Sequence, residues 1–386
     1  MSHQFPELYG IPVPDCKLFT GFKPCEPNKE CKTCQDPVPM GTRILIINFD
    51  AMGDVLRNTT ILKSIKRKFP ISHITWLTTQ RNSAILFNNP FIDRIAAYNT
   101  EETLFLMSQE FDEIFNLDKS ILACSLTNQF KATEKLGFGL NKNGAIVPLN
   151  PEAAYLFEMG ISDDLKFRKN TRTLSDITNE MLRLEYHRDE IILNLTSQEK
   201  NYIHKYRSEM GIRDHEIVVG LNTGCSEEFP NKKMTVEQHI QLIEKLTTID
   251  GVRCLLFGGP EDTVRNNQIA EYLGYKVIAT PTKMGQRHGL TLFDLADIII
   301  SGDALGMYAG IALKKYVIAW FGVTCHQEVD LYDRGEKIFP KDLLCSPCWK
   351  KDCPYDLECI SGINLDDIAG RVRAAISKGI KAEIPA

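Results

Sequence analysis

The residue with the clearest chemical potential near the start of the chain is Asp54, which ends a short loop between two regular patterns. The loop follows Ile44–Ile47, an unbroken apolar run typical of a buried parallel strand. After the loop, apolar residues recur at three- and four-residue steps and predict one helix over 55–69. Two interpretations of the carboxylate stand side by side: a cap for free backbone N–H groups of the helix, or a functional group where α/β folds build their sites.

The second half of the chain carries glycines at the ends of three predicted strands. These are Gly224, the pair Gly258 and Gly259, and Gly302, which is followed by Asp303. The ends of parallel strands lie along one edge of a sheet, and glycine lets the backbone approach a phosphate there. Three such ends predict a nucleotide-diphosphate site, with Lys232 or Lys233 as a fixed cation. The sequence contains neither a G-x-G-x-x-G fingerprint nor a Walker A loop, which argues against dehydrogenases and phosphate-loop enzymes.

Eight of the twelve cysteines fall into two groups of four, and each group contains one C-x2-C pair. The first group is Cys16, Cys25, Cys31 and Cys34, and the second is Cys345, Cys348, Cys353 and Cys359. Thiolates that converge in this way suit a structural zinc or iron ion, or an iron–sulfur cluster. Metal binding is the expected use of clustered thiols in a reducing compartment, and disulfides and free thiols are the alternatives. Residues 345–359 are therefore predicted to form a cysteine knuckle.

The overall composition is that of a soluble globular protein: of 386 residues, 43% are hydrophobic and 25% are charged. A formal net charge of −5 argues against general binding of nucleic acid. No apolar run reaches the length that spans a bilayer, and the first residues lack the pattern of a signal peptide. We therefore expect an intracellular protein.

Strand-like runs alternate with helical patterns in two series, separated by a less regular stretch over 141–190. The expected strands are 44–47, 74–77, 94–98, 113–117 and 135–140 in the first series, and 217–222, 252–257, 297–301 and 316–321 in the second. Such alternation predicts an α/β fold of two doubly wound, Rossmann-like domains that face a cleft, plus cysteine-rich loops. The expected limits are 1–40 for a cysteine-rich arm, 41–195 and 196–362 for the two domains, and 363–386 for a C-terminal helix and tail.

Several motifs in fixed order carry a resemblance to a known family. They read ILIINFDAMGDVL, GLNTG with NKKMTVEQH behind it, FGGPED, and SGDALGMYAGIALKK followed by AWFGVT. Together they resemble glycosyltransferase family 9, the ADP-heptose heptosyltransferases of lipopolysaccharide core assembly, over roughly residues 43–330. The resemblance implies a GT-B fold, with the acceptor on the first domain and the nucleotide-sugar on the second. It also implies inverting sugar transfer without a catalytic metal or other catalytic cofactor.

The resemblance implies roles for individual residues as well. Asp54 matches the aspartate proposed as the base that takes the proton from the acceptor hydroxyl. Lys232 matches the lysine that stabilises the departing diphosphate, with Lys233 as its neighbouring rival. The implied donor contacts are Thr223, Gly224, Gly258, Gly259, Glu261, Asp303, Leu305, Gly306 and Met307.

The last motif departs from the family pattern. After its aspartate the family usually shows Ser or Thr and then Gly, with His five residues beyond the aspartate. Here those positions are Ala304, Leu305 and Tyr308. The tryptophan often found after the family lysine is Met234. These differences leave a hydroxyl contact to the donor, and the identity of the sugar, open.

The predicted helix over 55–69 carries a basic face, which consists of Arg57, Lys63, Lys66 and Arg67. Its cations suit an acidic acceptor, such as a phosphorylated or Kdo-bearing saccharide. An ordinary solvated helix face carries the same charges. The acceptor-binding role of these four residues is therefore a hypothesis for the structure to test.

Together these features predict an inverting glycosyltransferase that moves heptose or a related sugar from an ADP-sugar to a saccharide or lipid-linked acceptor such as lipopolysaccharide core. Its expected place is the cytoplasm, with peripheral contact at the cytoplasmic face of the inner membrane. The alternative is a catalytically altered GT-B scaffold that acts as a metal-knuckle interaction protein. An iron–sulfur redox enzyme is a third reading. No nucleic acid partner is expected.

Overall fold

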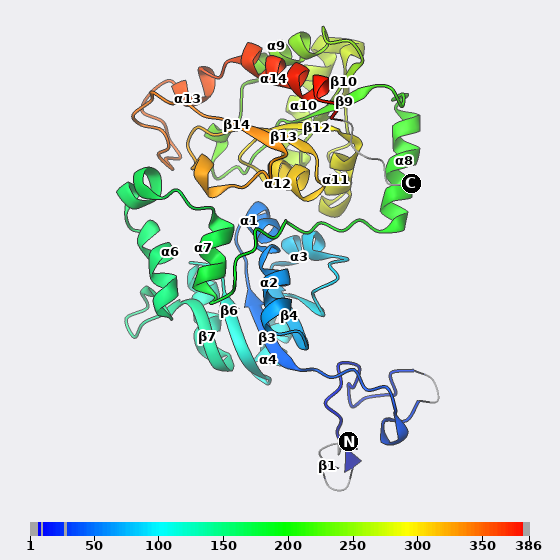
Figure 1. Ribbon diagram of the computed structural model, residues 1–386, viewed down its shortest axis with the longest axis vertical. Helices are drawn as coiled ribbons and strands as arrows, with labels where there is room; N and C mark the ends of the chain where they lie inside the picture. The colour runs from blue at the N-terminus through cyan, green and yellow to red at the C-terminus, as the bar shows by residue number, and fades with distance from the viewer. Residues whose placement is uncertain (1–6, 9–10, 27–28, 381–386) are drawn as a thin grey trace.

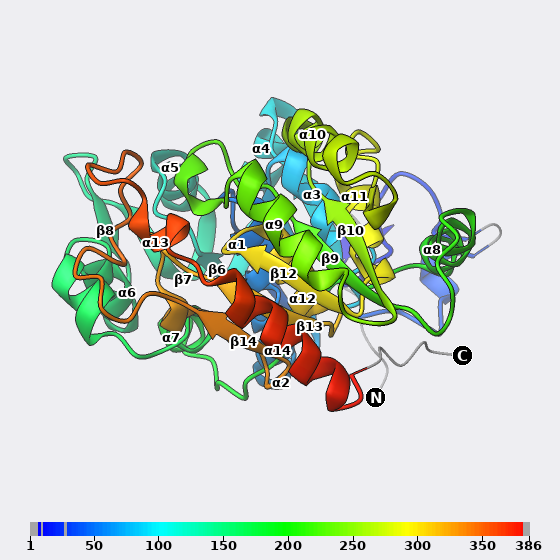
Figure 2. The same cartoon turned by 90° about the horizontal axis from the view of Figure 1, so that it is seen from above.

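Two six-stranded sheets with helices packed against them form the body of the molecule (Figures 1 and 2). The computed structural model describes residues 7–8, 11–26 and 29–380. The first sheet has the strand order β5-β4-β3-β6-β7-β8, and the second has the order β11-β10-β9-β12-β13-β14. Neighbouring strands are parallel in both sheets, except that β8 is antiparallel to β7. The prediction of two doubly wound sheets is confirmed.

The first sheet and its helices occupy the first half of the chain. Its strands are β3 (Thr42–Ile47), β4 (Ser72–Thr78), β5 (Arg94–Ala97), β6 (Glu110–Asn116), β7 (Lys131–Leu140) and β8 (Ile146–Pro148). Its helices are α1 (Met52–Asn58), α2 (Ile61–Lys68), α3 (Gln80–Leu86), α4 (Thr100–Met107), α5 (Ile121–Gln129), α6 (Ala154–Met159) and α7 (Leu174–Met181). Helices α6 and α7 lie in the less regular stretch over 141–190, in which the sequence predicts a helix at 173–185.

The second sheet repeats the pattern. Its strands are β9 (Ile217–Asn222), β10 (Val252–Phe257), β11 (Val277–Ala279), β12 (Ile298–Gly302), β13 (Tyr316–Trp320) and β14 (Gly335–Ile338). Its helices are α8 (Ser197–Glu209), α9 (Val236–Leu246), α10 (Thr263–Leu273), α11 (Gln286–Leu292), α12 (Leu305–Ala312), α13 (Glu358–Ser361) and α14 (Leu365–Ser377). Helices α9 and α14 pack side by side on one face of this sheet (Figure 2). The last residues of the predicted tail, 381–386, lie outside the described part of the chain.

Strand β3 shows why these runs are apolar throughout. Its neighbouring side chains point to opposite faces of the sheet, so Ile44 and Ile46 join one core cluster and Leu45 and Ile47 join another. All four are fully buried. Both faces of the strand therefore exclude water, which a parallel sheet covered by helices requires.

The helix predicted over 55–69 is wrong in one respect, because the chain breaks it into α1 and α2. The break falls at Thr59, whose hydroxyl donates to the carbonyl of Leu56 (2.7 Å) and accepts from the amide of Ile192 (2.8 Å). A threonine hydroxyl that bonds to nearby backbone competes with the helical pattern. Its second partner comes from the segment that connects the two sheets, so the break ties α1 to that connection.

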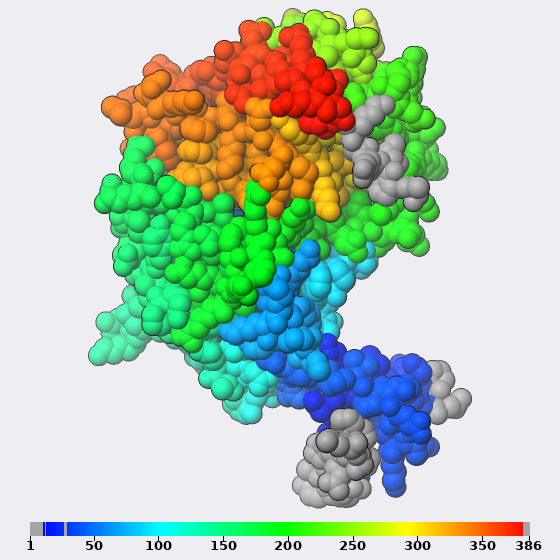
Figure 3. Space-filling view, in the orientation of Figure 1, coloured from blue at the N-terminus to red at the C-terminus, as the bar shows by residue number. Residues whose placement is uncertain are grey.

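The cysteine-rich arm lies at the end of the first domain that is remote from the second (Figures 1 and 3). Its described residues contain short strands at 7–8 and 11–12 and one 3-10 turn, Cys31–Thr33. The ammonium of Lys17 fixes the arm to the body, through the carbonyl of Ser72 (2.7 Å) and the carboxylate of Asp93 (2.6 Å). Because Ser72 begins β4, the arm packs beside the amino ends of the strands.

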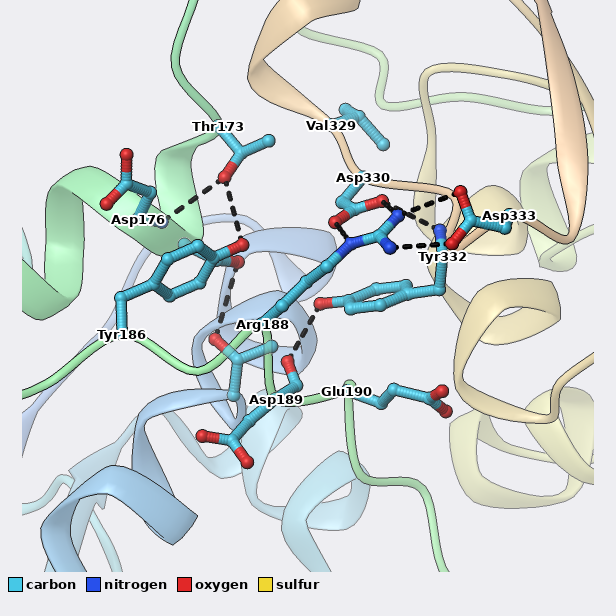
Figure 4. Close-up of polar contacts among 12 residues, drawn as sticks. Thr173, Asp176, Tyr186, Arg188, Asp189, Glu190, Val329, Asp330, Tyr332 and Asp333 are labelled. Atoms are coloured by element: carbon cyan, nitrogen blue, oxygen red, sulfur yellow. Dashed lines mark hydrogen bonds and ion pairs between the residues drawn. The ribbon is translucent and has the colours of Figure 1, made fainter.

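The segment between the two sheets is held to the second domain by a set of charge pairs (Figure 4). Arg188 donates to Asp330 through Nε (2.6 Å) and Nη2 (2.9 Å), and to Asp333 through Nη1 (2.6 Å). The hydroxyl of Tyr332 donates to the carbonyl of Asp189 (2.9 Å). The connecting segment is therefore fixed to the loop between β13 and β14.

In the described part of the chain, no helix combines the length and the apolar character that crossing a membrane requires.

Candidate active site

A cavity of about 920 Å³ lies between the two domains. From the first domain it is lined by the loop after β3, Arg57 and the start of α3, and from the second by the loops after β9, β10 and β12. These are the carboxyl ends of parallel strands, where α/β folds bind their ligands. The cleft predicted from the two strand series is present.

Asp54 lines this cleft from the first turn of α1. The N-cap position belongs to Ala51, and no side chain caps the helix. The carboxylate of Asp54 instead forms an ion pair with Arg57, one turn later in the same helix. The side chain of Asp54 is 38% exposed and that of Arg57 11%. The carboxylate is therefore oriented by an arginine and open to the cleft, and the cap interpretation is not what the structure shows.

Tyr308, the residue at the position of the family histidine, lies against this pair. Its ring packs so closely on Gly53 that a Cβ there would lie 2.9 Å from a ring carbon, which requires glycine beside Asp54. Its phenol group lies beside the Arg57 guanidinium. Burial, and next Asp303, raise the pKa of Tyr308 well above its usual value, so the hydroxyl stays neutral. Tyr308 thus joins the acidic loop of one domain to the donor edge of the other.

A buried acid below this loop was missed in the sequence. Asp118 follows β6 and is fully buried, and it accepts from the side-chain amide of Asn48 (2.6 Å) and from the backbone of Phe49 and Asp50. Burial, and next the neighbouring Asp50, raise the pKa of Asp118. Burial likewise raises the pKa of the neighbouring Asp50 carboxyl group. Asp118 fixes the shape of the loop that presents Asp54.

The glycines of the donor edge line the cleft as predicted for Gly224, Gly258, Gly259 and Gly306. The first three are packed around Asp262, which the sequence did not single out. Its Oδ2 accepts from the amide of Gly259 (2.9 Å), and a Cβ on Gly224 would overlap the same carboxylate. Burial raises the pKa of Asp262. Glycine here makes room for an internal acid as well as for a ligand.

Of the two candidate lysines, Lys232 is the one that lines the cleft. Its ammonium lies 3.6 Å from the carboxylate of Asp303 and 3.4 Å from the carbonyl of the same residue. Its own carbonyl accepts from the indole of Trp320 (2.9 Å). The side chain is only 16% exposed, so the charge is held in place between fixed partners. Lys233 does not line the cleft.

Other predicted donor residues divide between the cleft and the core. Glu261, Asp303 and Leu305 line the cleft. Met307 is fully buried in the core. The hydroxyl of Thr223 donates to Asn266 (2.5 Å) and is buried, so it supports the loop from behind and does not face the cavity. A strand end alone does not show which way a side chain points.

Most of the basic face proposed for acceptor binding lies outside the cleft. Only Arg57 lines the cleft. Lys66 donates to the carbonyl of Ser72 (3.1 Å) at the start of β4, and Arg67 pairs with Asp189 (2.5 Å). Lys63 is exposed on the same part of α2. Lys66 therefore lies near the amino end of β4, away from the carboxyl ends of the strands that line the cleft.

A second charged group on the cleft wall was also missed. Glu328 is buried, and its carboxylate lies 3.7 Å from the ammonium of Lys166, which comes from the first domain. Burial raises the pKa of Glu328. Trp349 lines the cleft beside them, although it belongs to the cysteine knuckle, residues 345–359. Neither residue has a sequence signal, since each depends on a partner far away in the chain.

The four cysteines of each group line one cavity. The arm cavity holds about 20 Å³ and the knuckle cavity about 430 Å³. Within the described residues, no three His, Cys, Asp or Glu side chains stand in the arrangement of a metal site. Burial raises the pKa of Cys359 to about 11. The charges of the other three knuckle cysteines contribute to this rise, but less than burial does. The four knuckle thiols are thus near enough to interact.

Comparison with known proteins places the chain in a family. The profile of glycosyltransferase family 9 (heptosyltransferase) matches residues 105–358. Lipopolysaccharide heptosyltransferase 1 of Campylobacter coli is 22% identical over 234 residues, which cover 50% of this chain and 68% of that protein.

Two solved structures illustrate the similarity in fold. The E. coli ADP-heptose LPS heptosyltransferase II matches with a TM-score of 0.65 and 16% identity, over 88% of this chain and 99% of that chain. The iron-containing dodecameric glycosyltransferase TibC of enterotoxigenic E. coli H10407 matches with a TM-score of 0.52 and 13% identity, over 88% and 77%. The GT-B expectation is confirmed. The chain belongs to glycosyltransferase family 9 and is a glycosyltransferase.

Proposed function

We propose that this enzyme transfers heptose or a related sugar from an ADP-sugar to a saccharide acceptor such as lipopolysaccharide core, with inversion at the anomeric carbon. The observation that carries the proposal is that Asp54 and Lys232, from different domains, line one cleft. A carboxylate for the incoming hydroxyl and a cation for the departing diphosphate are the two charges that such a displacement needs. The named activities of the relatives supply the sugar and acceptor classes.

In the proposed step, the acceptor hydroxyl attacks the anomeric carbon from the side of the first domain. A new C–O bond forms while the bond from that carbon to the diphosphate oxygen breaks. The hydroxyl proton passes to the carboxylate of Asp54, which Arg57 holds in orientation. The negative charge released on the ADP leaving group is met by the ammonium of Lys232 and by backbone N–H groups at the glycine loops. No catalytic metal takes part in this scheme.

The donor side of the proposal is tested by calorimetric titration with ADP and other nucleoside diphosphates. We expect binding, with ADP preferred. Transfer is then followed with ADP-heptose and a heptose-deficient lipopolysaccharide core, and the anomeric configuration of the product is assigned by NMR. A chain without affinity for any nucleoside diphosphate would contradict the proposal and favour the inactive interaction scaffold. Retention of configuration would contradict the inverting mechanism.

The acceptor class proposed here sets where the enzyme works. A lipid-linked saccharide is presented at a membrane surface, and an ADP-sugar is a cytoplasmic metabolite. We therefore assign the enzyme to the cytoplasmic face of the inner membrane as a peripheral protein. Cell fractionation tests this assignment: recovery with the membrane fraction at low salt and release at high salt would support it, because peripheral contact is largely electrostatic.

The cysteine groups are proposed to hold structural metal, as zinc, iron or an iron–sulfur cluster. Support comes from the four thiols that line each cavity and from the iron-containing relative TibC. Thiol sulfurs are soft ligands that suit these metals. Elemental analysis should find metal that falls in Cys31→Ser and in Cys348→Ser, one variant for each group. A metal-free protein whose intact mass rises on reduction would contradict metal binding and establish disulfides.

A further inference from the structure

The cysteine knuckle reaches the donor side of the cleft through three consecutive residues. The ring of Trp349 meets that of Phe229 edge to face, with 5.1 Å between centroids. The carbonyl of Lys350 accepts from Asn231 (2.6 Å), whose side chain is buried. The ammonium of Lys351 pairs with Glu228 (2.8 Å). We name residues 228–232, which end at the proposed diphosphate lysine, the donor loop. The knuckle contacts this loop at residues 228, 229 and 231.

Hydrogen bonds fix the knuckle to the body of the protein. The carbonyl of Val323, just beyond β13, accepts from the amides of Cys348 (3.2 Å) and Trp349 (2.9 Å). The hydroxyl of Ser346 donates to the carbonyl of Gly322 (2.6 Å). Arg168 of the first domain donates to the carbonyls of Leu344 (2.5 Å) and Ser346 (3.1 Å). The backbone around Trp349 is thus fixed to both domains.

The indole of Trp349 lies between two ammonium groups at the cleft wall. Lys232 lies 5.8 Å from the ring centroid, and Lys166, from the first domain, lies 4.4 Å from it. The Phe229 ring lies 5.4 Å from the same Lys232 ammonium. An aromatic face attracts a cation at these distances. Trp349 is 41% exposed and lines the cleft, so the ring is also within reach of a ligand.

We propose that Trp349 is a donor-positioning residue and that the knuckle is one wall of the nucleotide-sugar site. The ring keeps the Lys232 ammonium at the position where the diphosphate charge develops, and the contacts of residues 350 and 351 keep the donor loop in place. This inference deepens the proposed function and rests on it for the identity of the ligand. It predicts that damage to the knuckle weakens binding of the diphosphate, and leaves binding of the nucleoside intact.

The test compares ligands with and without phosphates on matched variants. Trp349→Ala should weaken ADP binding roughly five-fold, the scale of one lost cation–π contact, and leave adenosine binding unchanged. Trp349→Phe, which retains an aromatic face, should keep part of the ADP affinity that Trp349→Ala loses. Tyr355→Ala is the control, since Tyr355 lies in the same knuckle, is 60% exposed and does not line the cleft. Unchanged ADP affinity, or an equal loss for ADP and adenosine, would overturn the proposal.

A second measurement needs no nucleotide. Amide hydrogen exchange in the donor loop should be faster in Trp349→Ala than in wild type, because the Phe229 contact is lost, and unchanged in Tyr355→Ala. Equal exchange rates in all three proteins would contradict the proposal that Trp349 holds the donor loop in place. If the wild type binds no nucleoside diphosphate, the proposed function fails and the donor role of Trp349 fails with it. If the wild type binds ADP and the variants match it, only the role of Trp349 fails.

Discussion

The two edges of the cleft are built in different ways, although they belong to sheets of the same design. The edge of the first domain presents charged side chains, Asp54 with Arg57, on helix α1, and the loop before this helix is held by the buried Asp118. The edge of the second presents close backbone at Gly224 and Gly259, with one fixed cation. A small hydroxyl needs a single positioned base, whereas a diphosphate needs many donors around it. The same fold thus carries two kinds of recognition.

This difference predicts which step, turnover or donor binding, a mutation on each edge should affect. Changes on the first edge should affect turnover and leave donor binding intact. Changes on the second should affect donor binding through the space around the backbone.

Asp54→Asn removes the proposed base and keeps the size of the side chain. We expect the transfer rate to fall by roughly 10³-fold, within the range for general base catalysis, while the ADP dissociation constant stays within two-fold of wild type. Single-turnover kinetics and calorimetry measure the two quantities separately. Asp250→Asn, an exposed site in the turn after α9, is the control. Turnover at the wild-type rate in Asp54→Asn would remove this residue from the chemistry.

The two domains should also differ in how pH affects their stability. His239 of α9 is fully buried, and burial lowers its pKa from 6.5 to about 4. The unfolded chain takes up a proton near pH 6.5 and the folded chain does not until about pH 4, so stability is lost as pH falls through this window. The loss amounts to roughly 3 kcal/mol. The effect of Asp118 on stability has the opposite dependence on pH. Because its pKa is raised in the folded state, its contribution to stability is lost as pH rises above 3.8.

The measurement is the free energy of unfolding in urea between pH 7 and pH 4. His239→Gln should lose less stability over that range than wild type does, by about 3 kcal/mol. His204→Gln, on the exposed side of α8, is the control and should behave as wild type. If His239→Gln and wild type show equal acid losses, the buried neutral histidine is not responsible.

Lys232→Met and Lys233→Met form a matched pair on adjacent residues. The first removes the charge that lies in the cleft, and we expect kcat/KM for the donor to fall roughly 100-fold, as for the loss of one transition-state donor. The second removes a charge outside the cleft and should change kcat/KM little. The same assay serves both variants. An equal effect of the two would mean that net charge, and not position, matters on this edge.

Gly224→Ala tests the backbone side of the comparison with the smallest change. The new Cβ would overlap the carboxylate of Asp262, and making room for it costs about 1–3 kcal/mol. ADP binding should weaken roughly ten-fold for a cost near 1.4 kcal/mol. Gly289→Ala is the control, because Gly289 lines the same cleft and nothing lies within 4 Å of its added Cβ. Wild-type affinity in Gly224→Ala would show that the edge tolerates bulk.

Much of this arrangement follows from local sequence. Strand β9 begins and ends where its apolar run predicts, and the glycines after β9 and β10 line the cleft as expected. The errors have a common cause, which is a partner distant in the chain. The helix breaks at Thr59, whose hydroxyl accepts from the amide of Ile192, and Thr223 turns away from the cleft because its hydroxyl donates to Asn266. Hydrophobic periodicity predicts which residues are buried, but it does not predict which distant residues they contact.

The same limit explains why the two cysteine groups looked equivalent. Each has four thiols and one C-x2-C pair. The arm is attached by Lys17 at the amino ends of the strands, whereas the knuckle delivers Trp349 to the cleft. The spacing of cysteines predicts a local loop structure, and only the surrounding fold decides whether that loop can influence a reaction.

The grip of Arg188 on Asp330 and Asp333 has a mechanical consequence. Val329, next to Asp330, lines the cleft, so the charge pairs tie the connecting segment to the cleft wall itself. Domain opening must either carry this loop along with the connection or break both pairs together. Because salt screens charge pairs, higher ionic strength should weaken this tie.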